Sequence, residues 1–237
     1  MARSLLITGT DTGIGKTTVA SAIAAALRRR GHNIGVVKPV ETGCEPGSDG
    51  TLTASDALQL RWAAGRADPI EVVCPYRLRE PLAPSVAAQR DGATIEFADV
   101  VRHVRVVIES SELALVEGAG GLLVPLTTAS TFADLARACD LRVLVVVGNR
   151  LGAINHARLT LDWARAATLS VAGYVVNTLA ADADLAAQTN VEVLRELCGP
   201  SLGVLPFLGP IVRAESERAR LADAAEAALD LDALLSE

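Results

Sequence analysis

The chain has 237 residues, half of them hydrophobic, with a formal net charge of −6 at pH 7, so it can build one large core. The acidic balance argues against a broad nucleic-acid interface, which is normally basic, and 3% aromatic residues leave little surface for base stacking. The apolar runs are too short to span a membrane, and Met1–Ser4 leads into a short apolar segment without a secretory pattern, so we expect a cytoplasmic protein.

Apolar strands and amphipathic helices alternate along the chain. In chain order we expect a strand at Ser4–Thr8, a helix at Lys16–Arg30, a strand at Ile34–Val37, helices at Ser55–Ala64 (capped by Ser55 and Asp56) and Phe97–Ser110, a strand at Leu113–Val116, a helix at Thr131–Ala138, a strand at Arg142–Val147, a helix at Asn155–Ala167, a strand at Val171–Val176, a helix at Asp182–Leu197, a strand at Gly203–Leu205 and a helix at Ala214–Leu235.

This alternation predicts an α/β fold: a doubly wound, mainly parallel sheet flanked by helices. The stretch Glu45–Thr53, rich in Gly, Ser and Asp, is expected to be a mobile loop. No linker or repeat divides the sequence, so we expect a single domain over residues 1–237. The four cysteines are far apart and form no CxxC pair, which favours free thiols over a disulfide frame or a zinc site.

Polar and glycine-rich segments follow most of the predicted strands. They are Gly9–Thr17, Lys38–Thr42, Glu117–Gly121, Gly148–Asn155, Asn177-Thr178 and Pro206-Phe207. Because the carboxyl ends of parallel strands meet at one edge of a sheet, and ligands bind there, we expect the functional site at this edge.

The first of these segments predicts a phosphate-binding loop (P-loop). Glycines let backbone N–H groups surround phosphate oxygens at the start of a helix, while Lys16 would reach the β- and γ-phosphates and the Thr17 hydroxyl would bind Mg²⁺. Five residues, not the usual four, separate Gly9 from Gly15. The alternative is a glycine-rich turn with a solvated lysine.

Carboxylates for the metal are expected nearby. Glu117 follows a buried strand, where P-loop proteins place an acid on Mg²⁺, and Gly118–Gly121 would let a ligand approach the backbone. Asp56 is a second candidate, although it could simply cap its helix, and Asp49 is a weaker one. Glu117 could likewise only cap the turn that follows it.

Lys38 is notable because Lys16 and Lys38 are the only two lysines among 22 basic residues. It lies at the end of the second strand, before Pro39, where an ammonium would point toward the P-loop. There it could stabilise an anionic substrate group or a phosphoryl group in transfer. The alternative is a strand-end lysine in solvent.

Together these motifs resemble the dethiobiotin synthetases. The matching segments, in order, are GTDTGIGKT at Gly9–Thr17, KPVETG at Lys38–Gly43, SDAL at Ser55–Leu58, EPLAPSVAA at Glu80–Ala88, VEGAGGLLVPL at Val116–Leu126, FADLA at Phe132–Ala136, VVGNRLGAINHARLT at Val146–Thr160 and AGYVVN at Ala172–Asn177. The tail after Gly209 carries no matching motif. The resemblance implies a P-loop enzyme that uses ATP, Mg²⁺ and CO₂ to close the ureido ring on diaminopelargonic acid.

The resemblance also implies roles for individual residues. Lys16 and Lys38 would be catalytic, and Thr17, Asp56 and Glu117 would bind magnesium. The ATP contacts would come from Gly13, Ile14, Gly15, Lys16, Thr17, Thr18, Asp56, Glu117, Gly118, Ala119 and Gly120, with Asn177, Thr178, Pro206, Phe207 and Leu208 at the adenine. The diamine and carbamate would meet Thr12, Thr42 and Gly121, and the substrate carboxylate would meet Leu151, Gly152 and Asn155 of the second subunit of a homodimer.

Two positions depart from the family pattern. Gly13 replaces a P-loop glutamate, and Thr178 stands where an acid is often found.

Two other functions share the P-loop: a switch ATPase of the partitioning or positioning type, and a small-molecule kinase. The first would carry a signature lysine five residues before Lys16, where this chain has Asp11, and the second would not need Lys38.

Overall fold

The structure, a computed structural model, describes residues 4–182 and 184–236. Residues 1–3 of the expected N-terminal segment, and Ala183 of the helix expected at Asp182–Leu197, lie outside the described residues. Within these ranges no helix is both long and apolar enough to cross a membrane.

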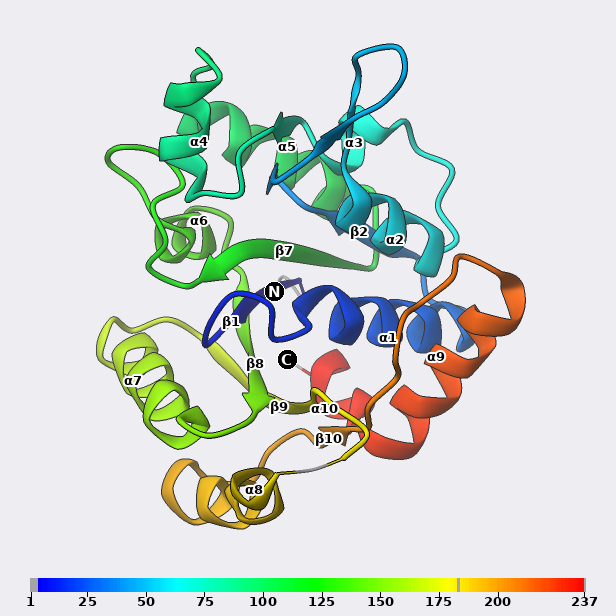
Figure 1. Ribbon diagram of the computed structural model, residues 1–237, viewed down its shortest axis with the longest axis vertical. Coiled ribbons are helices and arrows are strands. Elements are labelled where there is room, and N and C mark those ends of the chain that lie inside the picture. Colours follow the sequence, from blue (N-terminus) through cyan, green and yellow to red (C-terminus); the bar gives the residue numbers. More distant parts are fainter. Residues whose placement is uncertain (1–3, 183, 237) are drawn as a thin grey trace.

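A six-stranded sheet with every pairing parallel forms the centre of the molecule (Figure 1). The strand order is β10-β9-β8-β1-β7-β2. The strands are β1 (Leu5–Gly9), β2 (Ile34–Val37), β7 (Leu113–Gly121), β8 (Arg142–Asn149), β9 (Val171–Thr178) and β10 (Val204–Leu205). The predicted doubly wound parallel sheet is confirmed.

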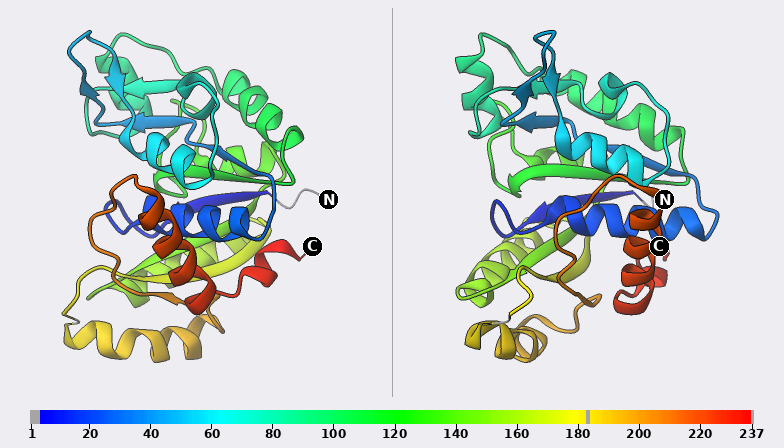
Figure 2. Two further views of the ribbon diagram at one scale, coloured as in Figure 1. Left: turned by 90° about the vertical axis from the view of Figure 1, so that its right-hand side faces the viewer. Right: turned by 45° about the vertical axis from the view of Figure 1, so that its right-hand side comes forward.

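Alternate residues of each strand pack on opposite faces of the sheet. In β1, Leu5 and Ile7 join one core cluster and Leu6 the other, as expected for a strand buried on both sides. The first face is covered by α1 (Lys16–Arg29), α2 (Ser55–Ala63), α9 (Glu215–Ala228) and α10 (Leu231–Leu235), and Figure 2 shows α1, α2 and α9 together on one side. The second is covered by α4 (Pro84–Arg90), α5 (Phe97–Glu109), α6 (Phe132–Ala138), α7 (Ala153–Ala166) and α8 (Leu185–Cys198).

Several predicted boundaries are wrong. The strand expected to end at Val116 continues through Gly121, so the glycine run belongs to β7 instead of a loop. The expected C-terminal helix is two helices, because Leu229 is extended and the Asp230 carboxylate accepts the N–H of Ala233 at the start of α10. Helix α7 begins at Ala153, two residues before the expected start.

The segment Glu45–Thr53 is not an irregular loop. It forms an antiparallel hairpin of β4 (Glu45–Pro46) and β5 (Leu52–Thr53). The turn is held by Asp49, whose carboxylate accepts from the backbone and hydroxyl of Thr51. The sequence pattern also missed β3 (Val40–Thr42), β6 (Tyr76–Leu78), α3 (Ile70–Val73) and α4, which are too short to show a period.

The expectation of free thiols is confirmed for all four cysteines: Cys44, Cys74, Cys139 and Cys198. Burial raises the pKa of each thiol, that of Cys44 and Cys139 to about 11. The raised pKa values favour the protonated thiol over the reactive thiolate at all four positions.

Candidate active site

The P-loop joins β1 to α1 and is held in place by a distant strand. Gly15 has φ +83°, and a Cβ at this position would lie 2.2 Å from Nδ2 of Asn177, so only glycine fits. Asn177, near the end of β9, donates from Nδ2 to the carbonyl oxygen of Ile14 at 2.9 Å and is itself buried. Asn177 therefore shapes the phosphate loop, a role that the sequence did not suggest.

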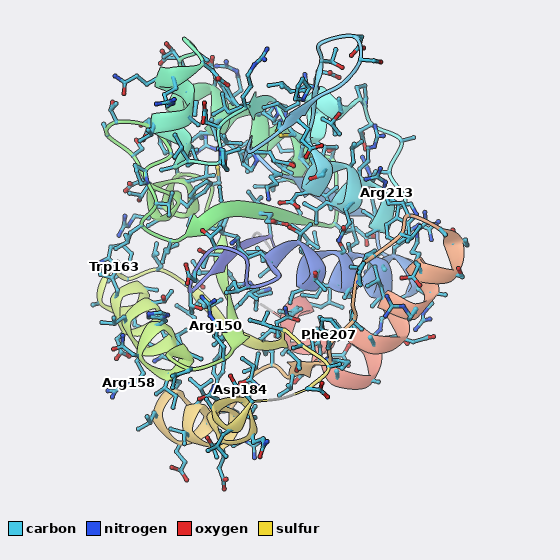
Figure 3. The ribbon with its side chains drawn as sticks, in the orientation of Figure 1. Arg150, Arg158, Trp163, Asp184, Phe207 and Arg213 are labelled. Atoms are coloured by element: carbon cyan, nitrogen blue, oxygen red, sulfur yellow. The ribbon has the colours of Figure 1, made fainter. Side chains whose placement is uncertain are left out.

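A second contact fixes the outer part of the loop. The Asp11 carboxylate accepts the N–H of Thr12 at 2.7 Å and forms an ion pair with Arg150, which follows β8 (Figure 3). Arg150 was not among the predicted site residues. The only available signal was its position within the polar segment after that strand.

Lys38 lies at the centre of an ion-pair network and is 4% exposed. Its Nζ donates to Oε1 of Glu117 at 2.8 Å and also to the Asp56 carboxylate. Burial alone would lower the pKa of Lys38, but the carboxylates of Glu117, Asp56 and Glu41 raise it above its ordinary value. The interpretation of Lys38 as a solvated lysine is therefore wrong.

Lys16 opens α1 and is also buried. Its Nζ donates to the carbonyl oxygen of Asp11 at 3.2 Å. Burial, together with the positive charge of Lys38, lowers the pKa of Lys16, while Glu117 and Asp56 oppose that shift. Two ammonium groups thus share one site, an arrangement suited to an anion with several charges.

The three residues expected to bind magnesium lie together. The Thr17 hydroxyl donates to Oε1 of Glu117 at 2.7 Å, and Lys38 bridges Glu117 to Asp56. The other oxygen of Glu117, Oε2, is buried with no hydrogen-bond partner among the described residues. One hydroxyl and two carboxylates, with an orphaned carboxylate oxygen, fit Mg²⁺ that takes its remaining ligands from phosphate and water.

Glu41 is a site residue that the sequence interpretation missed. Helix α2 begins after Ala54 without a side-chain cap of its own, so Ser55 and Asp56 do not cap it as expected. Instead, Glu41 accepts from the Asp56 and Ala57 N–H groups at 3.0 and 2.9 Å and from the Ser55 hydroxyl at 3.3 Å. A buried carboxylate from β3 thus caps α2 and orients Asp56.

Replacing Glu41 with alanine is expected to lower the free energy of unfolding by about 1–2 kcal/mol, the usual cost of losing a helix N-cap. Urea unfolding followed by circular dichroism measures it. Glu96→Ala is the matched control, because Glu96 precedes α5 without a side-chain cap bond and is exposed. Equal effects of the two substitutions would contradict the capping role of Glu41.

A cavity of about 400 Å³ collects most of the predicted phosphate, metal and substrate residues. Its lining includes Thr12, Gly13, Gly15, Lys16, Thr17, Thr18, Lys38, Glu41, Thr42, Asp56, Gln59, Glu117, Ala119 and Gly120. Gly13 has φ +72° with open space around its α-carbon, so glycine relieves strain there without being required by packing.

Other predicted residues do not line this cavity. Ile14 and Gly118 are buried outside its lining, and Gly121 lines a different surface hollow. Thr178 ends β9, while Pro206, Phe207 and Leu208 follow β10, with Phe207 45% exposed (Figure 3). Leu151, Gly152 and Asn155 lie at the exposed start of α7, where Leu151 is 82% exposed.

Comparison with known proteins places the whole chain among P-loop proteins. A family model described as an AAA domain matches residues 3–215. The chain is 42% identical over 212 residues to a protein of Anaeromyxobacter dehalogenans (strain 2CP-1) named ATP-dependent dethiobiotin synthetase BioD, covering 89% of this chain and 93% of that one. A protein of the same name from Thermodesulfovibrio yellowstonii is 37% identical, with both chains covered completely.

Solved structures give the fold. The MinC:MinD cell division complex of Aquifex aeolicus matches with a TM-score of 0.55 and 16% identity, covering 98% of this chain and 93% of that one. A ParA family ATPase from Chlorobium tepidum TLS matches with a TM-score of 0.50 and 13% identity, covering 95% and 93%. At such identities these similarities describe the architecture of the sheet and not an activity.

Proposed function

This chain belongs to the dethiobiotin synthetase family, and from that premise we propose that it catalyses the ATP-dependent ring closure of biotin biosynthesis. The substrates are diaminopelargonic acid and CO₂ with ATP, and the products are dethiobiotin, ADP and phosphate. The observation that carries this function is the placement of two buried lysines in one cavity with the P-loop.

The chemistry requires positive charge at each stage. One substrate amine adds to CO₂ and loses a proton, which leaves a carbamate. A carbamate oxygen then attacks the γ-phosphorus of ATP and ADP departs, and the second amine attacks the carbonyl carbon of the mixed anhydride, loses a proton and expels phosphate. The carbamate, the transferring phosphoryl group and the departing phosphate are all anions, so catalysis depends on position and charge stabilisation.

We assign the two lysines to different partners. Lys16 opens α1 at the P-loop, where it would neutralise the β- and γ-phosphates. Lys38 stands beside Glu117 and Asp56, where it would hold the carbamate and the phosphoryl group between them. Thr12 and Thr42 line the same cavity and would bind the diamine and carbamate.

Magnesium would be held by Thr17, Asp56 and Glu117. When bound, Mg²⁺ supplies charge neutralisation of the triphosphate. The network described above gives Glu117 a specific part: it accepts from Thr17 and Lys38 through one oxygen and leaves the other free for the metal.

The remaining assignments follow the family. Asn177, Thr178 and Pro206–Leu208 form the adenine edge, with Asn177 also bonded to the P-loop. The protein acts as a cytoplasmic homodimer, in which Leu151, Gly152 and Asn155 of each subunit receive the substrate carboxylate of the other. Support comes from their exposure at the start of α7, where first-turn N–H groups favour an anion.

No observation in the described residues specifically favours the switch ATPase or the small-molecule kinase. Asp11, at the position of the switch-ATPase signature lysine, is paired with Arg150. A small-molecule kinase would not need the buried Lys38, which faces two carboxylates in the phosphate cavity.

The direct test measures phosphate release from MgATP, with mass detection of dethiobiotin. Release is expected only when diaminopelargonic acid and bicarbonate are both present, with one dethiobiotin formed per phosphate, because the second amine must attack before phosphate leaves. Omitting each co-substrate in turn is the control. Phosphate release at the same rate without either co-substrate would favour the switch ATPase. A phosphorylated product without a ring would favour the kinase.

A further inference from the structure

A second hollow of about 550 Å³ is lined by five arginines. We call it the arginine pocket, and its defining residues are Arg28, Arg61, Trp62, Arg66, Arg213 and Arg218. They come from the end of α1, from α2 and the turn after it, and from the loop and first turn of α9. Figure 3 shows Arg213 beside the C-terminal end of α2. Among the described residues, no acidic side chain lines this hollow, although the whole chain is acidic.

Nearby acids neutralise only part of this charge. Arg66 forms an ion pair with Asp68 at 2.7 Å, and Arg61 donates to the Asp68 carbonyl oxygen at 3.0 Å. Arg218 pairs with Glu215 and stacks on Trp62, with its guanidinium 5.2 Å from the ring centre.

Two guanidinium groups remain unpaired. Within residues 4–182 and 184–236, the guanidinium groups of Arg28 and Arg213 make no hydrogen bond or ion pair. Arg28 lies directly over Gly65, where a Cβ would come within 2.0 Å of its Nε, so the glycine leaves room for this guanidinium. The pocket thus keeps two oriented donor groups without acceptors.

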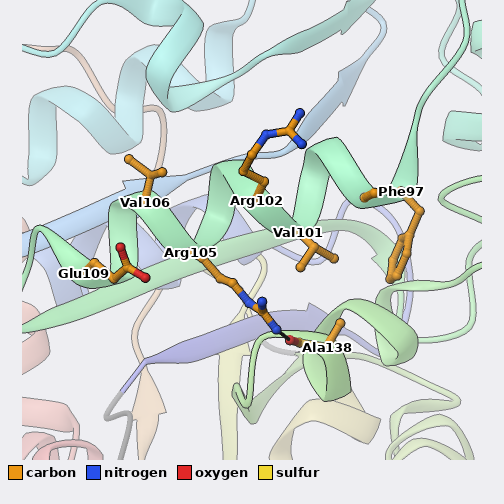
Figure 4. Close-up of a pocket in the computed structure, with 8 residues that line it drawn as sticks. Phe97, Val101, Arg102, Arg105, Val106, Glu109 and Ala138 are labelled. Carbon is orange, nitrogen blue, oxygen red and sulfur yellow. Dashed lines mark hydrogen bonds between the residues drawn. The ribbon is translucent and has the colours of Figure 1, made fainter.

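Another surface hollow provides a contrast (Figure 4). It also contains two arginines, but Arg105 donates to the Ala138 carbonyl oxygen at 2.6 Å and Arg102 pairs with Asp99. Glu109 lines the same hollow and adds a negative charge. Both arginines of this hollow therefore have an acceptor for their guanidinium groups, unlike Arg28 and Arg213 in the arginine pocket.

We propose that the arginine pocket binds a small phosphate-bearing anion at a site separate from the P-loop. Guanidinium groups match phosphate oxygens through paired N–H donors, and a group with several charges would offset the repulsion among five arginines. The volume is that of a typical ligand pocket and accommodates a pyrophosphate or a nucleotide-sized molecule.

The pocket is connected to the nucleotide edge through the chain itself. Arg213 lies at the end of the loop that begins with Pro206–Leu208, which we assigned to adenine. An anion bound to Arg213 would restrain this loop and change ATP affinity, and by linkage ATP would change anion affinity by the same factor. Anion binding in the arginine pocket does not depend on the proposed function. Its coupling to ATP does, because the coupling rests on the proposed adenine contacts of Pro206–Leu208.

Inorganic pyrophosphate is the probe, titrated calorimetrically into the full chain in magnesium-free buffer. The wild-type protein is expected to show two binding classes. Lys16→Ala should remove the P-loop class and keep the other. Arg28→Gln should weaken the second class about tenfold, the loss expected for one charged hydrogen-bonding partner, and keep the P-loop class.

Three further variants sharpen this result. Arg213→Gln removes the other unpaired guanidinium and should have the same effect as Arg28→Gln, whereas Arg28→Lys should weaken binding less because it keeps the charge. Arg102→Gln is the matched control and should leave both classes unchanged. A single class that Lys16→Ala abolishes, or a second class that Arg28→Gln and Arg213→Gln both leave intact, would overturn the site.

Discussion

Replacing Lys38 with glutamine is expected to lower the turnover of dethiobiotin formation at least one hundredfold while ATP binding is largely kept. Lys38 is one of two cations in the cavity, and it stands between the carboxylates of Asp56 and Glu117. Loss of one preorganised charge donor from such a site costs about 10²–10³ in rate. Because those carboxylates raise the pKa of Lys38, its charge is present throughout the pH 7–9 range of an assay.

The measurements are single-turnover phosphate transfer and equilibrium binding of an ATP analogue. Glutamine leaves two carboxylates without their ammonium partner, so the melting temperature must be measured alongside. We expect Mg²⁺ to raise that temperature more in Lys38→Gln than in the wild type, because the metal can replace the missing charge. Turnover within a few-fold of the wild type in a folded variant would exclude the role assigned to Lys38.

Glu117→Gln is expected to lower turnover by a similar factor through a different cause. The substitution keeps the size of a side chain that is 1% exposed and removes its charge. It would weaken the proposed magnesium site. It would also remove one of the two carboxylates that accept a hydrogen bond from the Lys38 ammonium, so that Asp56 remains as the other. The magnesium concentration for half-maximal rate should therefore rise, whereas nucleotide binding without magnesium should change little.

A titration of rate against magnesium, together with nucleotide binding measured with and without the metal, tests this expectation. Glu196→Gln is the control, because Glu196 is exposed on α8, away from the cavity. If the half-maximal magnesium concentration stayed constant while turnover fell, Glu117 would act by orienting Lys38 and Thr17 and not by binding the metal.

Glu41 shows why part of the site was not found from the sequence. A capping side chain is normally sought just before its helix, and the sequence before α2 suggested Ser55 and Asp56. The residue that caps α2 instead comes from β3, fourteen to sixteen positions earlier. No local pattern predicts this contact, because it depends on how β3 is placed beside the start of α2.

The sequence by itself determined the six strands of the central sheet, most helices, the P-loop and the candidate roles of Lys16, Lys38 and Glu117. These features follow from short-range properties: the period of apolar residues, glycine where a turn requires it, and polar residues after each strand.

Only the tertiary structure decided which distant groups meet. Asn177 reaches the carbonyl of Ile14, Arg150 reaches Asp11, and five arginines from separate segments share one pocket. The strand order β10-β9-β8-β1-β7-β2 brings these segments together, and long-range packing, not local propensity, sets that order.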